Sequence, residues 1–162
     1  MRVEIQQLPA GQIAAFRLQG AREATFSKGA TMLTDWLNRN RLNGEFIAVY
    51  HDDPLQVSIN KSCVAMGVAV PAEFILPPDS EGVTLLSIPS ACYAVAQVTV
   101  SDGNFAQPWN LFFKQWLPGS GYQRAEGLCF DRYLNDGLQT GIWDMLICIP
   151  IEKCISDGAI KR

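Results

Sequence analysis

The chain has 162 residues, of which 48 % are hydrophobic and 18 % charged, and its net charge is −3. This composition excludes an intrinsically disordered chain, and the acidic balance argues against a protein that grips nucleic-acid phosphates by itself, because such proteins carry basic surfaces. The length is typical of one domain with a sizeable core.

The first half predicts one β-α-β-β unit. A strand pair is expected over residues 3–18, broken at Pro9, and a helix over residues 25–40. Strands follow over residues 46–50, which are β-branched and aromatic, and over residues 63–70, after a polar loop. The apolar positions of the helix recur with helical spacing at Phe26, Ala30, Leu33 and Leu37.

The second half predicts the same order of elements. After a proline-rich connection over residues 71–82, a long or bent strand pair is expected over residues 83–100 and a helix over residues 105–117. Closing strands are expected over residues 128–134 and 143–151, and a polar tail over residues 153–162. The second helix carries an unusually aromatic stripe: Phe105, Trp109, Phe112, Phe113 and Trp116.

The two halves are copies of each other. Residues 8–15 reappear as residues 88–95 (88 − 8 = 80), and residues 49–53 reappear as residues 132–136 (132 − 49 = 83). Two copies with this period predict a tandem duplication with pseudo-twofold symmetry. We therefore expect an α+β fold with a curved antiparallel sheet and two main helices. A single domain is expected over residues 1–152, with repeat halves at about 1–71 and 82–152.

Targeting signals and metal motifs are not indicated. Polar residues interrupt the first 18 residues, so they do not form a secretory signal peptide, and no apolar run approaches the ~20 residues of a membrane span. The five cysteines are scattered and contain no CxxC pair, which indicates neither a zinc site nor a redox dithiol. We expect a cytoplasmic protein with reduced thiols, no membrane contact, no metal and no cofactor.

Asp131 is the leading candidate for a functional residue. In the strand over residues 128–134, alternation places Cys129, Asp131 and Tyr133 on one face. A carboxylate between a thiol and a phenol, on the floor of an aromatic pocket, would attract a cation. The alternative is that this face is exposed and that Asp131 pairs with a basic neighbour.

Four aromatic residues complete the predicted ligand site. Tyr50 and Tyr133 are equivalent through the repeat, and each presents a ring and a hydroxyl group from a strand. Trp109 lies on the second helix, where one or two aromatic residues could face a cleft. Trp143 stands beside Asp144, for which a structural hydrogen bond is favoured. The single histidine, His51, lies in a sequence typical of an exposed turn.

Several segments of the chain resemble the bacterial DNA gyrase inhibitor family, in the same order and over most of its length. The segments are FIAVYHDDP (46–54), SEGV (80–83), YAVA (93–96), FAQPW (105–109), FF (112–113), CFDRYLNDG (129–137) and GIWD (141–144). The resemblance implies a tandem β-α-β-β fold, similar to the effector-binding domains of multidrug-sensing transcription regulators. No helix-turn-helix precedes the first strand, so a stand-alone version of this domain is expected.

The resemblance also implies function. Members of the family bind DNA gyrase and reduce its supercoiling activity, which protects cells against gyrase poisons and some DNA-damaging compounds. Related effector-binding domains hold lipophilic cations with a glutamate in the strand that matches residues 129–133. Here Asp131 takes that position and is one methylene shorter. Some related proteins hydrolyse alkylating compounds with an acid in this groove.

Three functions are therefore considered. The preferred one is a stand-alone inhibitor that binds gyrase and does not bind nucleic acid directly. The second, compatible with the first, is a module that binds a lipophilic or cationic small molecule through Asp131, Tyr133, Tyr50, Trp109 and Trp143. The least favoured is a hydrolase in which Asp131 acts as general base. No standard catalytic motif is present in the sequence, so an enzyme is the less favoured class.

Overall fold

The computed structural model describes residues 2–20, 22–50, 62–104, 106–135, 137 and 140–154. The predicted turn at His51 and most of the loop before β4 lie outside the described residues, as does the tail beyond Cys154. The elements, in chain order, are β1 (Arg2–Leu8), β2 (Gly11–Gly20), α1 (Arg22–Arg39), β3 (Phe46–Tyr50), β4 (Ser62–Val70), β5 (Val83–Ile88), β6 (Ala91–Val100), α2 (Ala106–Leu111), β7 (Tyr122–Arg124), β8 (Cys129–Tyr133) and β9 (Trp143–Lys153).

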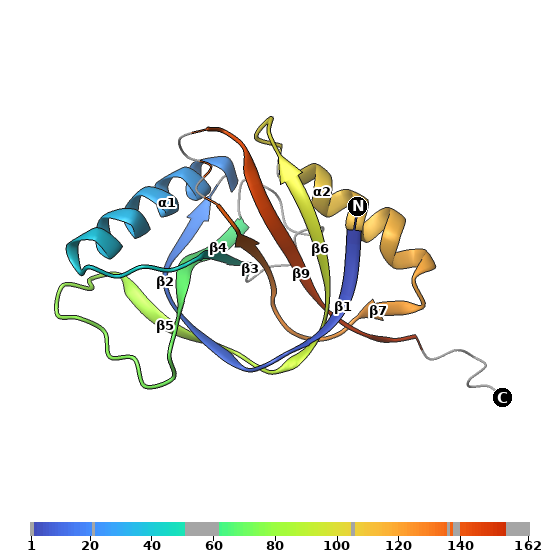
Figure 1. Cartoon of the computed structure of the whole chain (residues 1–162), viewed down its shortest axis with the longest axis horizontal. Coiled ribbons are helices and arrows are strands. Elements are labelled where there is room, and N and C mark those ends of the chain that lie inside the picture. Colours follow the sequence, from blue (N-terminus) through green and yellow to red (C-terminus); the bar gives the residue numbers. More distant parts are fainter. Residues whose placement is uncertain are drawn as a thin grey trace.

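The strands form one curved antiparallel sheet in the order β1-β6-β9-β8-β3-β4-β2-β5, and β7 pairs with β9. The order of equivalent strands is the same from either end of the sheet. The strands β1, β6, β9 and β8 at one end correspond to β5, β2, β4 and β3 at the other. Helix α1 packs against β2 and β4, and α2 lies over the other half of the sheet (Figure 1). The predicted α+β class, with a curved antiparallel sheet and two main helices, is confirmed.

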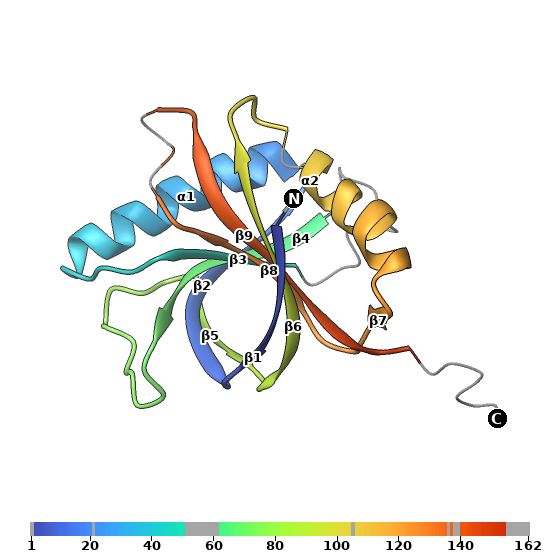
Figure 2. The same ribbon diagram turned by 45° about the vertical axis from the view of Figure 1, so that its right-hand side comes forward.

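The two halves are joined at two places. At the centre of the sheet β3 pairs with β8, and Ala48 lies directly opposite Asp131. Along the other ladder, β1 pairs with β6 and β2 pairs with β5 in one continuous register, from Leu8 opposite Ala91 to Gly11 opposite Ile88. Figure 2 shows these four strands curving together on the side away from the helices. In each half, the first strand therefore pairs with a strand of the other half: β1 with β6, and β5 with β2.

The sheet has apolar side chains on both faces. On the helix side, buried residues of β3, β8 and β9 pack against the aromatic side chains of α2 and the turn after it. On the other side, a second cluster fills the inside of the curl and includes Ile13, Val49, Tyr93 and Phe130. A third cluster under α1 is centred on Trp36, whose indole nitrogen donates to Ser80 Oγ at 3.0 Å and so ties the connection between the halves to α1.

The second helix lies where it was predicted, over about residues 105–117, but its form changes along its length. The described chain is α-helical over Ala106–Leu111 and then forms a π-helical segment (Phe112–Trp116) and a 3-10 turn (Leu117–Gly119). The Leu117 amide donates to the Phe112 carbonyl, five residues back, and the next residue, Pro118, has no amide hydrogen with which to continue a helix. Phe112 and Phe113, at the start of the π-helical segment, are both buried. Strand β7 was not predicted, because three residues give no periodic signal.

Candidate functional site

Asp131 lies at the centre of the molecule. Its strand β8 alternates as predicted, so Cys129, Asp131 and Tyr133 face the aromatic side chains of α2 while Phe130 faces the inside of the curl. Among the described residues Asp131 is the charged side chain that is buried, with 0 % exposure. The alternative of an exposed face is therefore wrong, because α2 and its aromatic side chains cover this face.

Three described side chains donate hydrogen bonds to the same oxygen of Asp131. The distances to Oδ2 are 2.6 Å from the Tyr50 hydroxyl, 3.3 Å from the Tyr133 hydroxyl and 3.4 Å from Trp109 Nε1. Hydrogen bonds to an ionised acceptor are stronger than those between neutral groups, and they offset part of the cost of burying the charge. The site is thus a carboxylate enclosed by aromatic donors.

The repeat explains why two of these donors are tyrosines. Tyr50 and Tyr133 occupy equivalent places on β3 and β8, which pair around Ala48 and Asp131. The pseudo-twofold axis therefore passes through the Ala48–Asp131 pair, with one tyrosine on each side. Only the second copy carries an acid at the central place. Trp109 comes from α2 and packs edge-on against Tyr50, with ring centres 5.2 Å apart.

The environment keeps the Tyr133 phenol protonated. Burial, and then the neighbouring Tyr50 and the Asp131 carboxylate, raise the pKa of Tyr133 well above its ordinary value of 10.0. A protonated phenol donates a hydrogen bond, whereas a phenolate would repel the carboxylate. Tyr133 therefore acts as a donor across the physiological pH range.

Trp143 is separated from the Asp131 carboxylate by the Tyr133 side chain. Its ring centre is 5.3 Å from that of Tyr133 and 5.3 Å from that of Phe26 on α1. Of the other four predicted ligand-binding residues, the structure thus brings three (Tyr50, Trp109 and Tyr133) to the Asp131 carboxylate, and it places Trp143 behind Tyr133. The carboxylate of Asp144, on the other face of β9, accepts a hydrogen bond from Thr99 Oγ1 at 2.9 Å, a side-chain contact between neighbouring strands rather than a contact with a backbone edge or a turn.

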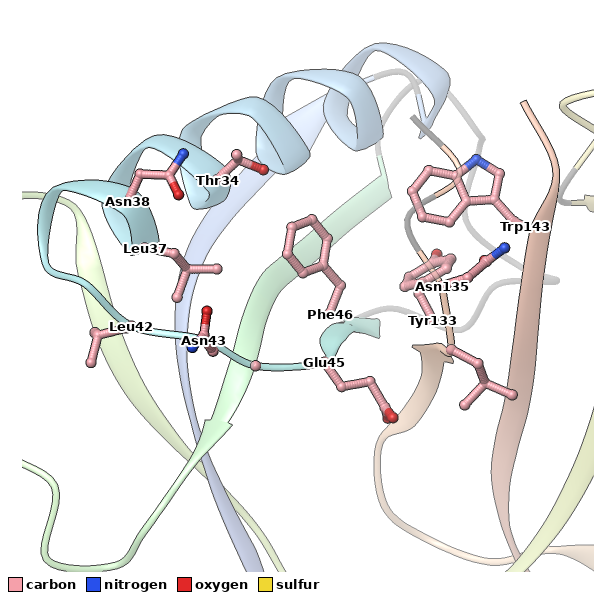
Figure 3. A pocket seen from close by; sticks show the side chains of 12 residues that line it. Thr34, Leu37, Asn38, Leu42, Asn43, Glu45, Phe46, Tyr133, Asn135 and Trp143 are labelled. Atoms are coloured by element: carbon pink, nitrogen blue, oxygen red, sulfur yellow. The ribbon is translucent and has the colours of Figure 1, made fainter. Parts of the chain in front are cut away.

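A cavity of about 400 Å³ opens beside Tyr133. It lies between α1, the connection to β3 and the ends of β8 and β9 (Figure 3). Phe46, Tyr133 and Trp143 supply its aromatic wall, and Glu45 stands at its edge with a 2.6 Å bond from Arg132 Nε. Its lining residues are Thr34, Leu37, Asn38, Leu42, Asn43, Gly44, Glu45, Phe46, Tyr133, Leu134, Asn135 and Trp143.

Phe46 was missed as a site residue, although a signal for it existed. It lies on the same face of β3 as Tyr50, four residues earlier, and pairs with Tyr133 across the sheet. Glu45 and Asn43 had no such signal, because they come from the irregular connection between α1 and β3. Within the described ranges, no group of three or more histidine, cysteine or acidic residues could hold a metal ion. None of the described helices is long and apolar enough to cross a membrane.

These features define a class: a two-repeat domain whose curved sheet and two helices enclose an acidic group among aromatic rings. The chain belongs to the GyrI-like family, described as a GyrI-like small molecule binding domain, which it matches over residues 1–152. It is 42 % identical over 153 residues to the DNA gyrase inhibitor of Erwinia billingiae, an alignment that covers 94 % of this chain and 99 % of the relative.

Solved structures share the fold at low sequence identity. The crystal structure of the EcmrR C-terminal domain has a TM-score of 0.71 and 12 % identity, and the match covers 94 % of this chain and 98 % of that domain. The structure of SAV2435 bound to tetraphenylphosphonium has a TM-score of 0.63 and 10 % identity, with 94 % of each chain covered. At these identities the likeness shows the fold alone.

Proposed function

We propose that this protein binds DNA gyrase, lowers its supercoiling activity and thereby protects cells against gyrase poisons and DNA-damaging compounds. The observation that carries the proposal is the end-to-end alignment at 42 % identity with a relative named DNA gyrase inhibitor. The net charge of −3 suits contact with a protein that handles DNA better than contact with DNA itself. With this gyrase-binding role we also propose that the protein is cytoplasmic.

A supercoiling assay tests this proposal. The purified protein should reduce the conversion of relaxed plasmid to supercoiled plasmid by gyrase, and it should not shift duplex DNA in a gel. An equal amount of an unrelated acidic protein serves as the control for non-specific charge effects. Unchanged supercoiling at a large molar excess of the protein counts against the proposal.

We also infer that a lipophilic cation binds beside Asp131. The supporting observation is the buried carboxylate under the rings of Tyr50, Trp109 and Tyr133. A cation gains from an opposite charge in a low-dielectric site and from the faces of aromatic rings. The cavity beside Tyr133 and Trp143 offers the space next to this cluster for the apolar part of such a ligand.

Thermal unfolding with tetraphenylphosphonium tests the cation site. The cation should raise the melting temperature of the wild type and raise that of Asp131→Asn much less. Asp144→Asn is the matched control, because it removes the same charge from a carboxylate that bonds to Thr99 on the other face of β9. Equal shifts in the wild type and Asp131→Asn would remove Asp131 as the counter-ion.

Hydrolysis of a reactive alkylating compound is the third candidate, with Asp131 taking a proton from water and Tyr133 or Tyr50 orienting that water. The three hydrogen bonds to Oδ2 hold the carboxylate as an acceptor, which favours binding over proton transfer. We therefore propose a binding role rather than an enzymatic one. Turnover of an alkylating compound by the wild type, lost in Asp131→Asn with binding retained, would reverse this choice.

A further inference from the structure

A cation of the protein itself already lies against the aromatic cluster. Arg124 ends strand β7, which pairs with β9 through Arg124 and Ile151. Its guanidinium carbon is 5.1 Å from the centre of the Phe113 ring, within the range of a cation–π contact. Its Nη2 atom lies 3.8 Å from Cys129 Sγ, to which it donates.

Phe113 and Cys129, which Arg124 contacts, both belong to the cluster around Asp131. The Phe113 ring stacks on Trp109, with ring centres 5.5 Å apart and an interplanar angle of 20°, and Trp109 donates to Asp131. Cys129 precedes Asp131 by two residues on the same face of β8. The guanidinium therefore contacts two residues next to Asp131: Phe113, which stacks on Trp109, and Cys129, which lies on the same strand as Asp131.

We propose that Arg124 is a specificity-determining residue that competes with cationic ligands for this site. The inference rests on the proposed cation site at Asp131. The guanidinium occupies a face of the Phe113 ring, which stacks on Trp109, and its charge opposes a second positive charge nearby. A ligand cation must therefore displace Arg124 or bind against its repulsion.

The position of Arg124 makes displacement feasible. The residue is partly exposed, at the end of a three-residue strand near the surface. A long arginine side chain can keep its methylene groups on apolar surface while its charged head moves to water. Arg124 therefore lowers the affinity of the site for cations, whereas Asp131 raises it.

Two substitutions at one position separate charge from shape. Arg124→Gln removes the charge and keeps a shorter polar side chain, whereas Arg124→Lys keeps the charge. Lys153→Gln is the matched control, because it removes the same net charge from an exposed residue at the end of β9. Binding of tetraphenylphosphonium and of neutral triphenylphosphine oxide is measured by isothermal titration calorimetry. Urea unfolding first shows that each variant is folded.

We expect Arg124→Gln to bind tetraphenylphosphonium about tenfold more tightly than the wild type, as removal of a nearby like charge implies. Arg124→Lys and Lys153→Gln should stay within about threefold of the wild type, since the first keeps the local charge and the second removes an exposed charge that solvent and salt screen. Affinity for the neutral ligand should be the same in all four proteins.

Each other outcome has a defined meaning. If the wild type binds the cation and Arg124→Gln binds it equally or more weakly, the inference about Arg124 is wrong and the cation site stands. An equal gain in Lys153→Gln, or an equal gain for the neutral ligand in Arg124→Gln, also overturns it, because the effect would then be general charge or space. If neither the wild type nor Arg124→Gln binds the cation, the proposed cation site falls as well.

Discussion

The two halves of the molecule share one frame but pack their helices differently. In the first half, α1 lies so close to the sheet that a Cβ atom on Gly29 would come within 2.6 Å of Leu18 and Met66. In the second half, the equivalent position (109 − 29 = 80) is Trp109, which is 1 % exposed and reaches Asp131. At the axis itself, Ala48 faces Asp131. The duplication built the frame, and the differences between the copies built the site.

Removal of the Trp109 side chain from α2 should have the largest effect on the free energy of unfolding. Trp109→Ala removes a buried indole and a donor to Asp131, so we expect a loss of about 3–5 kcal/mol in the free energy of unfolding. Gly29→Ala should cost only about 1 kcal/mol, because the overpacking is partly offset by the better helix propensity of alanine. Urea unfolding measures both. Equal losses of unfolding free energy in the two variants would contradict the view that α1 and α2 pack against the sheet through different contacts.

A second acid at the axis should be the next most damaging change. Ala48 has 0 % exposure and pairs with Asp131, so Ala48→Asp places two carboxylates side by side in the core. We expect a loss of about 3 kcal/mol at pH 7, because one buried carboxylate then lacks compensation. The difference from the wild type should shrink in acid, where one proton relieves the repulsion. Failure of Asp131→Asn to restore stability in the Ala48→Asp protein would contradict this explanation.

The two tyrosines should be unequal despite their symmetry. The Tyr50 hydroxyl is 2.6 Å from Asp131 Oδ2, whereas the Tyr133 hydroxyl is 3.3 Å away. We expect Tyr50→Phe to lower the free energy of unfolding by about 2 kcal/mol, the range for a hydrogen bond to a charged group, and Tyr133→Phe to lower it by less than about 1 kcal/mol. Chemical denaturation of the two variants decides, and the reverse order would mean that the distances do not rank these bonds.

Alkaline pH should reveal one further asymmetry. Cys148 pairs with Phe130 at the place where the first half has Gly67 paired with Ile47. Burial, and then the Asp131 charge, raise the pKa of the Cys148 thiol from 9.0 to about 12. The unfolded thiol ionises first, so its contribution is complete below pH 9 and is lost as pH rises toward 12. Relative to Cys148→Ala, the wild type should lose about 1.4 kcal/mol more between pH 8 and pH 10. Identical losses in urea unfolding at the two pH values would refute the shift.

Much of the frame was predictable from the sequence because its signals are periodic. Strand β3 was predicted with its observed bounds, and the alternation in β8 placed Asp131 and Tyr133 on one face. Periodicity shows which side chains share a face, but not which face another element covers. The burial of Asp131 depends on how α2 packs, so the sequence left two alternatives open.

The remaining parts of the site depend on contacts between distant segments. The position of Trp143 behind Tyr133 follows from how α1 reaches across to β9 through Phe26, and no local pattern encodes that reach. The contact of Arg124 with Phe113 needs both the short strand β7 and the π-helical segment, and neither has a periodic signature.

The exchanged strands have a consequence for synthesis on the ribosome. Strand β1 finds its partner only when residues as late as Gln97, opposite Arg2, have been made. Strand β2 likewise waits for β5 to cover one of its edges. The nascent first half therefore leaves the ribosome with uncovered strand edges, which are templates for unwanted pairing with other chains. Pairing over such a long span of sequence also favours slow folding, and the edges of β1 and β2 find these partners only once β5 and β6 have been made.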